Sequence, residues 1–75
     1  MLVSELKVGQ QARILSLTVG HPSYRHRLIA MGLIPGTIFE VLRMAPLGDP
    51  IEIKVRGFAL SLRKGEANIL QIEEV

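Results

Sequence analysis

The segment Gly32–Gly36 has the sequence GLIPG, the segment Ala45–Pro50 has the sequence APLGDP, and an apolar run at residues 37–44 lies between them. Glycine and proline clusters of this kind mark turns, and the run that they enclose has the length and the side chains of a β-strand. Neither the segments nor the rest of the chain contains a nucleophile with its base, a metal-ligand cluster or a phosphate-binding loop. The pattern therefore predicts a small folded barrel that works by binding and not by catalysis.

Length and composition limit the chain to a single domain, residues 1–75. A domain of this size buries only about 60% of the surface of its unfolded chain, so its core is thin. Hydrophobic residues make up 48% of the chain but aromatic residues only 4%, and we expect some of this aliphatic surface to remain for a partner. Without cysteine there is no disulfide or thiolate metal site. No signal peptide or apolar run of about 20 residues is present, which favours a cytoplasmic protein without a membrane span.

One α-helix is predicted at residues 22–31. Pro22 suits a first helical position because its missing N–H would have no partner there. Apolar side chains then recur at helical spacing, at Tyr24, Leu28 and Met31. Gly32 follows the last of them, where a left-handed residue commonly ends a helix.

The remaining segments are predicted as short strands. Residues 11–17 place Ala12 and Ile14 on one face, and residues 37–44 form the strand between the two turns. Residues 51–56 alternate strictly between β-branched and charged side chains, and residues 58–62 alternate again after Gly57. A turn at residues 64–67 leads to a last strand around residues 70–72. The expected fold is therefore mainly β, an SH3-like barrel of about five antiparallel strands with one inserted helix.

Several of these residues are expected to shape turns. The predicted turn residues are Gly32, Pro35, Gly36, Pro46, Gly48, Asp49 and Pro50. The sequence at residues 34–37 fits a type II turn. For the segment Ala45–Pro50 two interpretations stand: a plain hairpin connection, in which Asp49 bonds nearby N–H groups, or a docking loop with Leu47 at its tip. Leucine is costly to leave in water unless something covers it, either the domain's own helix or a partner.

The order and spacing of these motifs resemble the FeoA family. The resemblance is carried by RHRL at residues 25–28, MGLIPG at residues 31–36, APLGDP at residues 45–50, FALSLR at residues 58–63 and Glu66-Ala67. It runs from about Leu6 to Ile72. The resemblance implies an SH3-like fold, a role in bacterial ferrous iron uptake and binding to FeoB, a membrane GTPase, on its cytoplasmic side. Recruitment to the inner membrane by that partner and weak self-association are compatible with it, and no cofactor is expected.

An aliphatic patch near the helix end is the predicted partner-binding surface. Its members are Ile29, Leu33, Met44 and Leu47. The strand at residues 37–44 is apolar on both faces, with Phe39 and Val41 on one and Ile38, Leu42 and Met44 on the other. The barrel interior covers only one of these faces, so either the helix or a partner must cover the second.

Charged side chains give a second prediction. Arg25, His26 and Arg27 follow the helix start, where the helix dipole disfavours cations, so Arg25 and Arg27 are assigned to partner binding. A solvated helix face is the plain alternative. In the partner-binding interpretation, the positive surface extends through neighbouring strands to Lys54, Arg56, Arg63 and Lys64.

Metal binding and nucleic-acid binding are two other functional classes for such a chain. His21 and His26 are weak metal candidates, because a closed site typically takes about four placed ligands, so no functional metal site is predicted. A nucleic-acid-binding or transcription-regulator module of SH3-like fold is the alternative function. A net charge of +2 and three aromatic residues argue against nucleic acid, which requires clustered cations and stacking rings.

Overall fold

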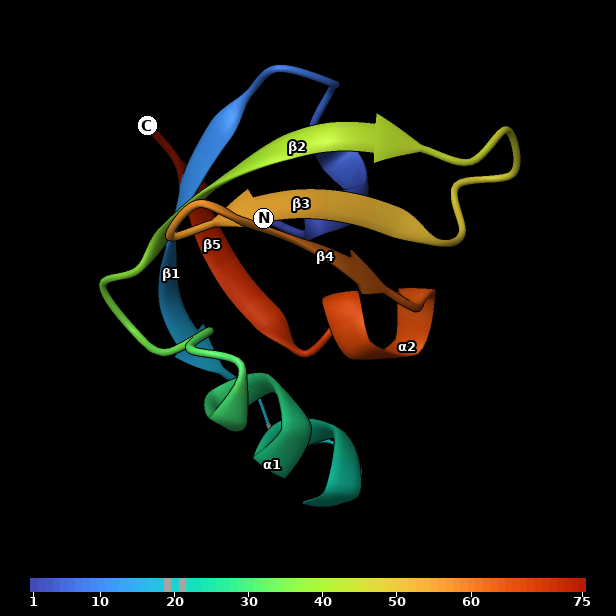
Figure 1. Cartoon of the computed structure of the whole chain (residues 1–75). Coiled ribbons are helices and arrows are strands. Elements are labelled where there is room, and N and C mark those ends of the chain that lie inside the picture. The colour runs from blue at the N-terminus through green and yellow to red at the C-terminus, as the bar shows by residue number, and fades with distance from the viewer. Residues whose placement is uncertain (19, 21) are drawn as a thin grey trace.

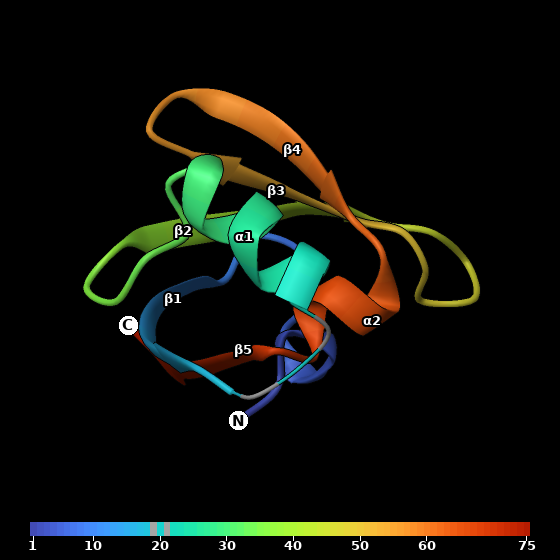
Figure 2. The same ribbon diagram turned by 90° about the horizontal axis from the view of Figure 1, so that it is seen from below.

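The computed structural model describes residues 1–18, 20 and 22–75, and it is built on a five-stranded antiparallel sheet (Figure 1). The strands are β1 (Gln11–Leu17), β2 (Ile38–Met44), β3 (Ile51–Val55), β4 (Phe58–Leu62) and β5 (Leu70–Glu74). Their spatial order is β4-β3-β2-β1-β5, and the sheet curls around one core so that β4 and β5 form its two edges (Figure 2). The predicted mainly β fold with five antiparallel strands is confirmed.

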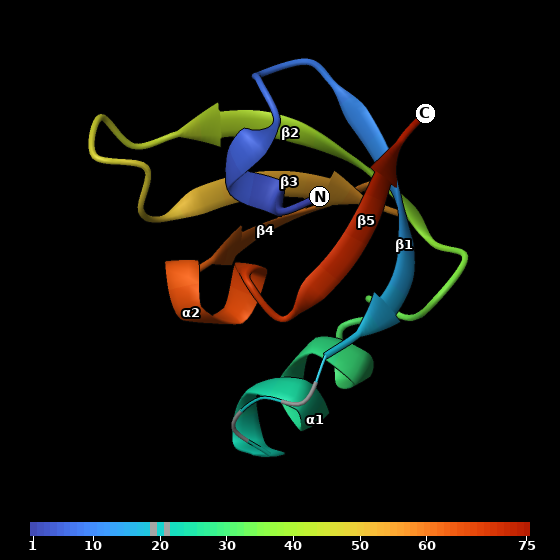
Figure 3. The same ribbon diagram turned by 180° about the vertical axis from the view of Figure 1, so that it is seen from behind.

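Helix α1 (Pro22–Ala30) stands between β1 and β2 in the sequence and confirms the predicted inserted helix, which ends one residue earlier than expected. A 3-10 helix, η1 (Val3–Glu5), packs against β5 and against the second helix, α2 (Lys64–Ala67) (Figure 3). Within the described residues, no helix is long and apolar enough to cross a membrane.

The turn predicted at residues 64–67 is instead the single helical turn of α2. Glu66 Oε1 accepts a hydrogen bond from the Arg63 N–H at 3.0 Å, and Asp49 Oδ1 accepts one from the Lys64 N–H at 3.0 Å. Both bonds satisfy N–H groups that the start of a helix leaves without a partner. The Asp49 bond joins residues 15 positions apart, so this carboxylate caps a distant helix and not the local turn that the sequence suggested.

The strict alternation in β3 is confirmed by its burial. Ile51, Ile53 and Val55 are buried, Glu52 is half-buried and Lys54 is exposed. The core that these side chains share comes from all five strands, both α-helices and the N-terminal segment. Its members are Val3, Leu6, Ala12, Ile14, Leu28, Leu33, Phe39, Val41, Ile51, Ile53, Val55, Leu62, Ala67, Ile69, Leu70 and Ile72.

A β-bulge in β2 changes the face on which one predicted surface residue lies. Val41 pairs with Ile53 and Met44 pairs with Ile51, so β2 has one more residue than β3 between these pairs. Opposite residues of an antiparallel pair share a face, and Met44 therefore turns toward the core, where it is half-buried and packed against the cluster. The prediction that Met44 lies on the outer face of the strand is wrong for this reason.

Candidate functional site

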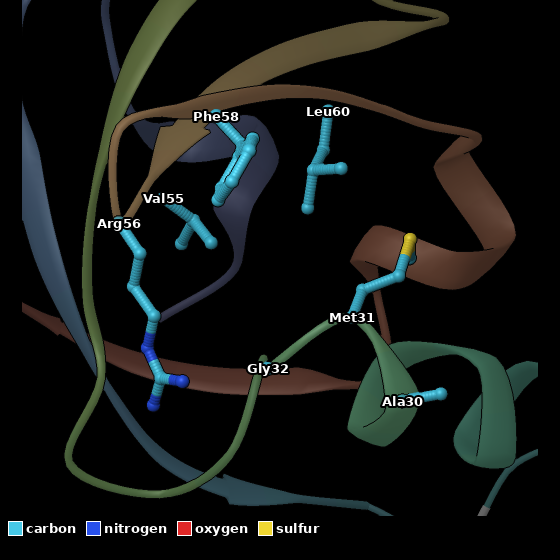
Figure 4. A pocket seen from close by; sticks show the side chains of 7 residues that line it. All are labelled: Ala30, Met31, Gly32, Val55, Arg56, Phe58 and Leu60. Atoms are coloured by element: carbon cyan, nitrogen blue, oxygen red, sulfur yellow. The ribbon is translucent and has the colours of Figure 1, made fainter.

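A groove of about 250 Å³ lies between the C-terminal end of α1 and the β3–β4 hairpin (Figure 4). It is lined by Ala30, Met31, Gly32, Val55, Arg56, Phe58 and Leu60. Phe58 and Leu60 extend from β4 toward the side of Met31, and Arg56 lies at one end. A concave apolar surface with one charged group at its rim is typical of a binding site.

The hairpin turn fixes the arginine at the rim of the groove. Arg56 and Gly57 are the two residues between the paired Val55 and Phe58, with φ of 51° and 83°. Positive φ at both positions is the pattern of a type I′ turn, which suits Gly57 but strains an arginine by about 1–2 kcal/mol. A strained cation beside an apolar groove is a candidate functional residue.

The end of α1 explains the position of Leu33. Gly32, with φ of 88°, donates its N–H to the Ile29 carbonyl, and Leu33 donates its N–H to the Leu28 carbonyl, each at 3.0 Å. These two bonds form a Schellman motif, which commonly brings the residues at the Leu28 and Leu33 positions into apolar contact. Both leucines are fully buried in the core. The prediction that Leu33 contributes to an exposed patch is therefore wrong.

The four residues of the predicted patch do not form one surface. Ile29 is 43% exposed on α1, whereas Leu47 is 95% exposed at the tip of the β2–β3 loop. That loop projects from the sheet away from the C-terminal end of α1 (Figures 1 and 3). The domain's own helix therefore does not cover Leu47, and Ile29 and Leu47 remain two separate exposed apolar points.

The structure assembles a groove that the sequence did not single out. Phe58, Leu60 and Leu62 alternate along β4 as predicted, but Phe58 is 70% exposed, Leu60 is half-buried and Leu62 is buried. The sequence feature that could have indicated the groove is Phe58, one of two phenylalanines in the chain, which directly follows Gly57. Alternation alone did not show that side chains on this face of β4 become more exposed toward the hairpin turn.

The predicted basic group lies on the exposed side of α1, where Arg25, His26 and Arg27 are all exposed. Arg27 Nη1 lies 3.4 Å from Glu66 Oε2, and the Glu66 side chain is only 2% exposed. This ion pair ties α1 to α2, so Arg27 has a structural role in addition to any role in binding.

Metal ligation has little support in the described residues. They contain no group of three or more histidine, cysteine, aspartate or glutamate side chains that could hold an ion. His26 is exposed on α1, and the other weak candidate, His21, lies outside the described residues.

Comparison with known proteins places the chain in a family. A family model described as the FeoA domain matches residues 1–74. The Fe(2+) transport protein A/Fe(2+) transporter FeoB fusion protein of Porphyromonas gingivalis is 34% identical over 73 residues, which are 97% of this chain and 8% of that relative. The chain thus spans only a small part of that relative's length.

Solved structures agree with this assignment. The solution structure of the FeoA protein from Chlorobium tepidum is 41% identical with a TM-score of 0.89, over all of this chain and 70% of that one. Stenotrophomonas maltophilia FeoA in complex with zinc, described as a prokaryotic SH3 domain protein, is 25% identical with a TM-score of 0.85. That match covers 97% of this chain and 89% of that one. The predicted SH3-like fold is confirmed.

Proposed function

The chain belongs to the FeoA family, and from this premise we propose that it is a non-enzymatic accessory protein of bacterial ferrous iron uptake that binds a FeoB-type transporter. The observation that carries the proposal is the relative in which the same domain is joined to FeoB in one polypeptide. A covalent link gives two domains a high effective concentration toward each other. The domain then contacts the transporter through its own surface, on the cytoplasmic side in this proposal.

The groove between α1 and the β3–β4 hairpin is the proposed contact surface. Phe58 and Leu60 offer apolar area, and Arg56 offers a charge that forms no ion pair with any described residue. Ile29, Arg25 and Arg27, all exposed on α1, extend this surface along the helix. Leu47 is a second, separate contact in the same proposal, because a side chain 95% exposed contributes nothing to the core.

Retention of the transporter by the tagged chain tests the proposal. The full-length FeoB-type transporter of the same organism, in detergent, is passed over immobilised chain with and without GTP. Arg56→Glu and Lys54→Glu change the net charge equally and at nearby exposed positions, but only Arg56 lines the groove of Figure 4. We expect the wild type and Lys54→Glu to retain the transporter and Arg56→Glu to lose it. A wild-type chain that retains no transporter in either nucleotide state contradicts the proposal.

A further inference from the structure

Strand β4 is an unprotected edge of the sheet. It stands last in the order β4-β3-β2-β1-β5, and in the described part of the chain no strand pairs with its outer side (Figure 2). Proteins usually protect such edges with charged side chains, proline or a bulge, because free N–H and C=O groups attract other strands. The sequence of β4, FALSL, contains no charge and no proline, and its pairing with β3 shows no bulge.

The hairpin register shows which backbone groups are free. Val55 and Phe58 close a two-residue turn, so they are hydrogen-bonded to each other. Residues of an antiparallel strand alternate between bonding one neighbour and facing the other side. Phe58, Leu60 and Leu62 therefore bond β3, whereas Ala59 and Ser61 direct their N–H and C=O groups outward. Both of these residues are exposed.

The free edge adjoins the groove described above. Phe58 and Leu60 extend from β4 into that groove, on the same face of the sheet (Figure 4). A strand added beside β4 places every second side chain on this face, next to Phe58 and Leu60. Main-chain bonds to an edge together with pockets for alternate side chains are the basis of peptide recognition by strand addition.

We propose that an extended segment of the transporter adds to the β4 edge as a further antiparallel or parallel strand, an inference that rests on the proposed function. The groove lining contains one cation, Arg56, and no carboxylate. The segment is therefore apolar at alternate positions and has an acidic side chain that reaches Arg56.

A second copy of the chain fits the same edge less well. Cations flank β4 at both ends, with Arg56 before the strand and Arg63 and Lys64 after it. An antiparallel pair of β4 strands brings the Arg56 end of each copy near the Arg63–Lys64 end of the other, and like charges brought together are unfavourable. Charge therefore favours the acidic segment over self-pairing.

Amide hydrogen exchange of the full chain, alone and with the full-length transporter in detergent, tests the inference. In the free chain the N–H groups of Ala59 and Ser61 should exchange fast, and those of Phe58, Leu60 and Leu62 slowly. With the transporter we expect the exchange of Ala59 and Ser61 to slow by at least about tenfold.

A matched pair of variants distinguishes a partner strand that hydrogen-bonds to the β4 backbone from a partner that only covers the β4 side chains. Ser61→Pro removes an outward N–H and is tolerated on an edge, whereas Ser61→Ala keeps the N–H. We expect transporter affinity to fall about tenfold for Ser61→Pro and to stay within about twofold for Ser61→Ala. If thermal unfolding shows that Ser61→Pro does not fold, the exchange measurement on the wild type decides.

Three results overturn the inference in distinguishable ways. If the transporter binds but Ala59 and Ser61 still exchange fast, strand addition is wrong and the proposed function stands. If the wild type does not bind at all, both fail. If these amides become protected without transporter as the chain concentration rises, the occupant of the edge is a second copy.

Discussion

Strands β3 and β4 pair residue for residue, yet their inward side chains have different environments. On β3, Ile51, Ile53 and Val55 are at most 2% exposed, whereas their partners on β4 range from buried Leu62 to 70% exposed Phe58. The central strand has a neighbour on each side and the core beneath it. The edge strand has one neighbour, and the cover over its face ends before Phe58. The pair thus separates residues that stabilise the fold from residues available to a partner.

The largest expected effect comes from the central strand. Ile53→Ala leaves a cavity in the core and should lower the free energy of unfolding by about 2–5 kcal/mol. Phe58→Ala should lower it by at most about 1 kcal/mol, because most of the ring is already in water. Urea unfolding of both variants measures the difference. Equal losses would contradict the division between the two strands.

Glu66 should have the next largest effect. Glu66→Ala removes the acceptor of the Arg63 N–H and the partner of Arg27 in a buried position, so we expect a loss of about 1–3 kcal/mol. Glu73→Ala is the control, since Glu73 pairs with Arg13 at 2.8 Å but with both side chains exposed. Surface pairs of this kind are worth about 0–1 kcal/mol. Thermal or urea unfolding measures both losses. A larger loss of unfolding free energy for Glu73→Ala than for Glu66→Ala would contradict this ranking by burial.

The hairpin turn should have a smaller effect. Gly57 has φ of 83°, so Gly57→Ala should cost about 1–2 kcal/mol in unfolding free energy. Gly57→Asn should cost less, because asparagine tolerates this region better. Calorimetric unfolding of the two variants checks the order, and a cost for asparagine as large as that for alanine would argue against backbone strain as the cause.

The smallest effect on stability is expected at the loop tip. Leu47→Glu should leave the free energy of unfolding within about 0.5 kcal/mol of the wild type, because the side chain is 95% exposed. Transporter affinity should nevertheless fall if this loop is a second contact. A variant with unchanged stability and unchanged affinity would remove Leu47 from the proposed surface.

The sequence predicted the elements well where local patterns determine them. The alternation at residues 51–55 corresponds to β3, and the helix bounds predicted from Pro22 and Gly32 correspond closely to those of α1. Helix α2 escaped prediction because its caps include Asp49, a residue distant in the sequence, and because Gly65 weakens any helical pattern.

The candidate site was predicted less well, for two physical reasons. The bulge in β2 turns Met44 inward, and the Schellman motif draws Leu33 into the core. Strand alternation and the aliphatic content of the chain therefore wrongly predicted that both side chains lie on an exposed patch. The groove depends on how α1 packs beside a hairpin more than 20 residues later in the chain, which no local pattern encodes. The alternation in β4 shows that Phe58, Leu60 and Leu62 lie on one face of the strand. It does not show that the exposure of these side chains increases from Leu62 to Phe58.

The most direct test of the account is the dissociation constant of the full-length FeoB-type transporter for wild-type chain, Phe58→Ala and Leu15→Ala. Phe58 and Leu15 are both at least half exposed, but only Phe58 lines the groove. We predict that Phe58→Ala weakens binding about tenfold, or about 1.4 kcal/mol, and that Leu15→Ala leaves it unchanged. Equal affinities for all three chains would contradict the claim that the open face of β4 is where the transporter binds.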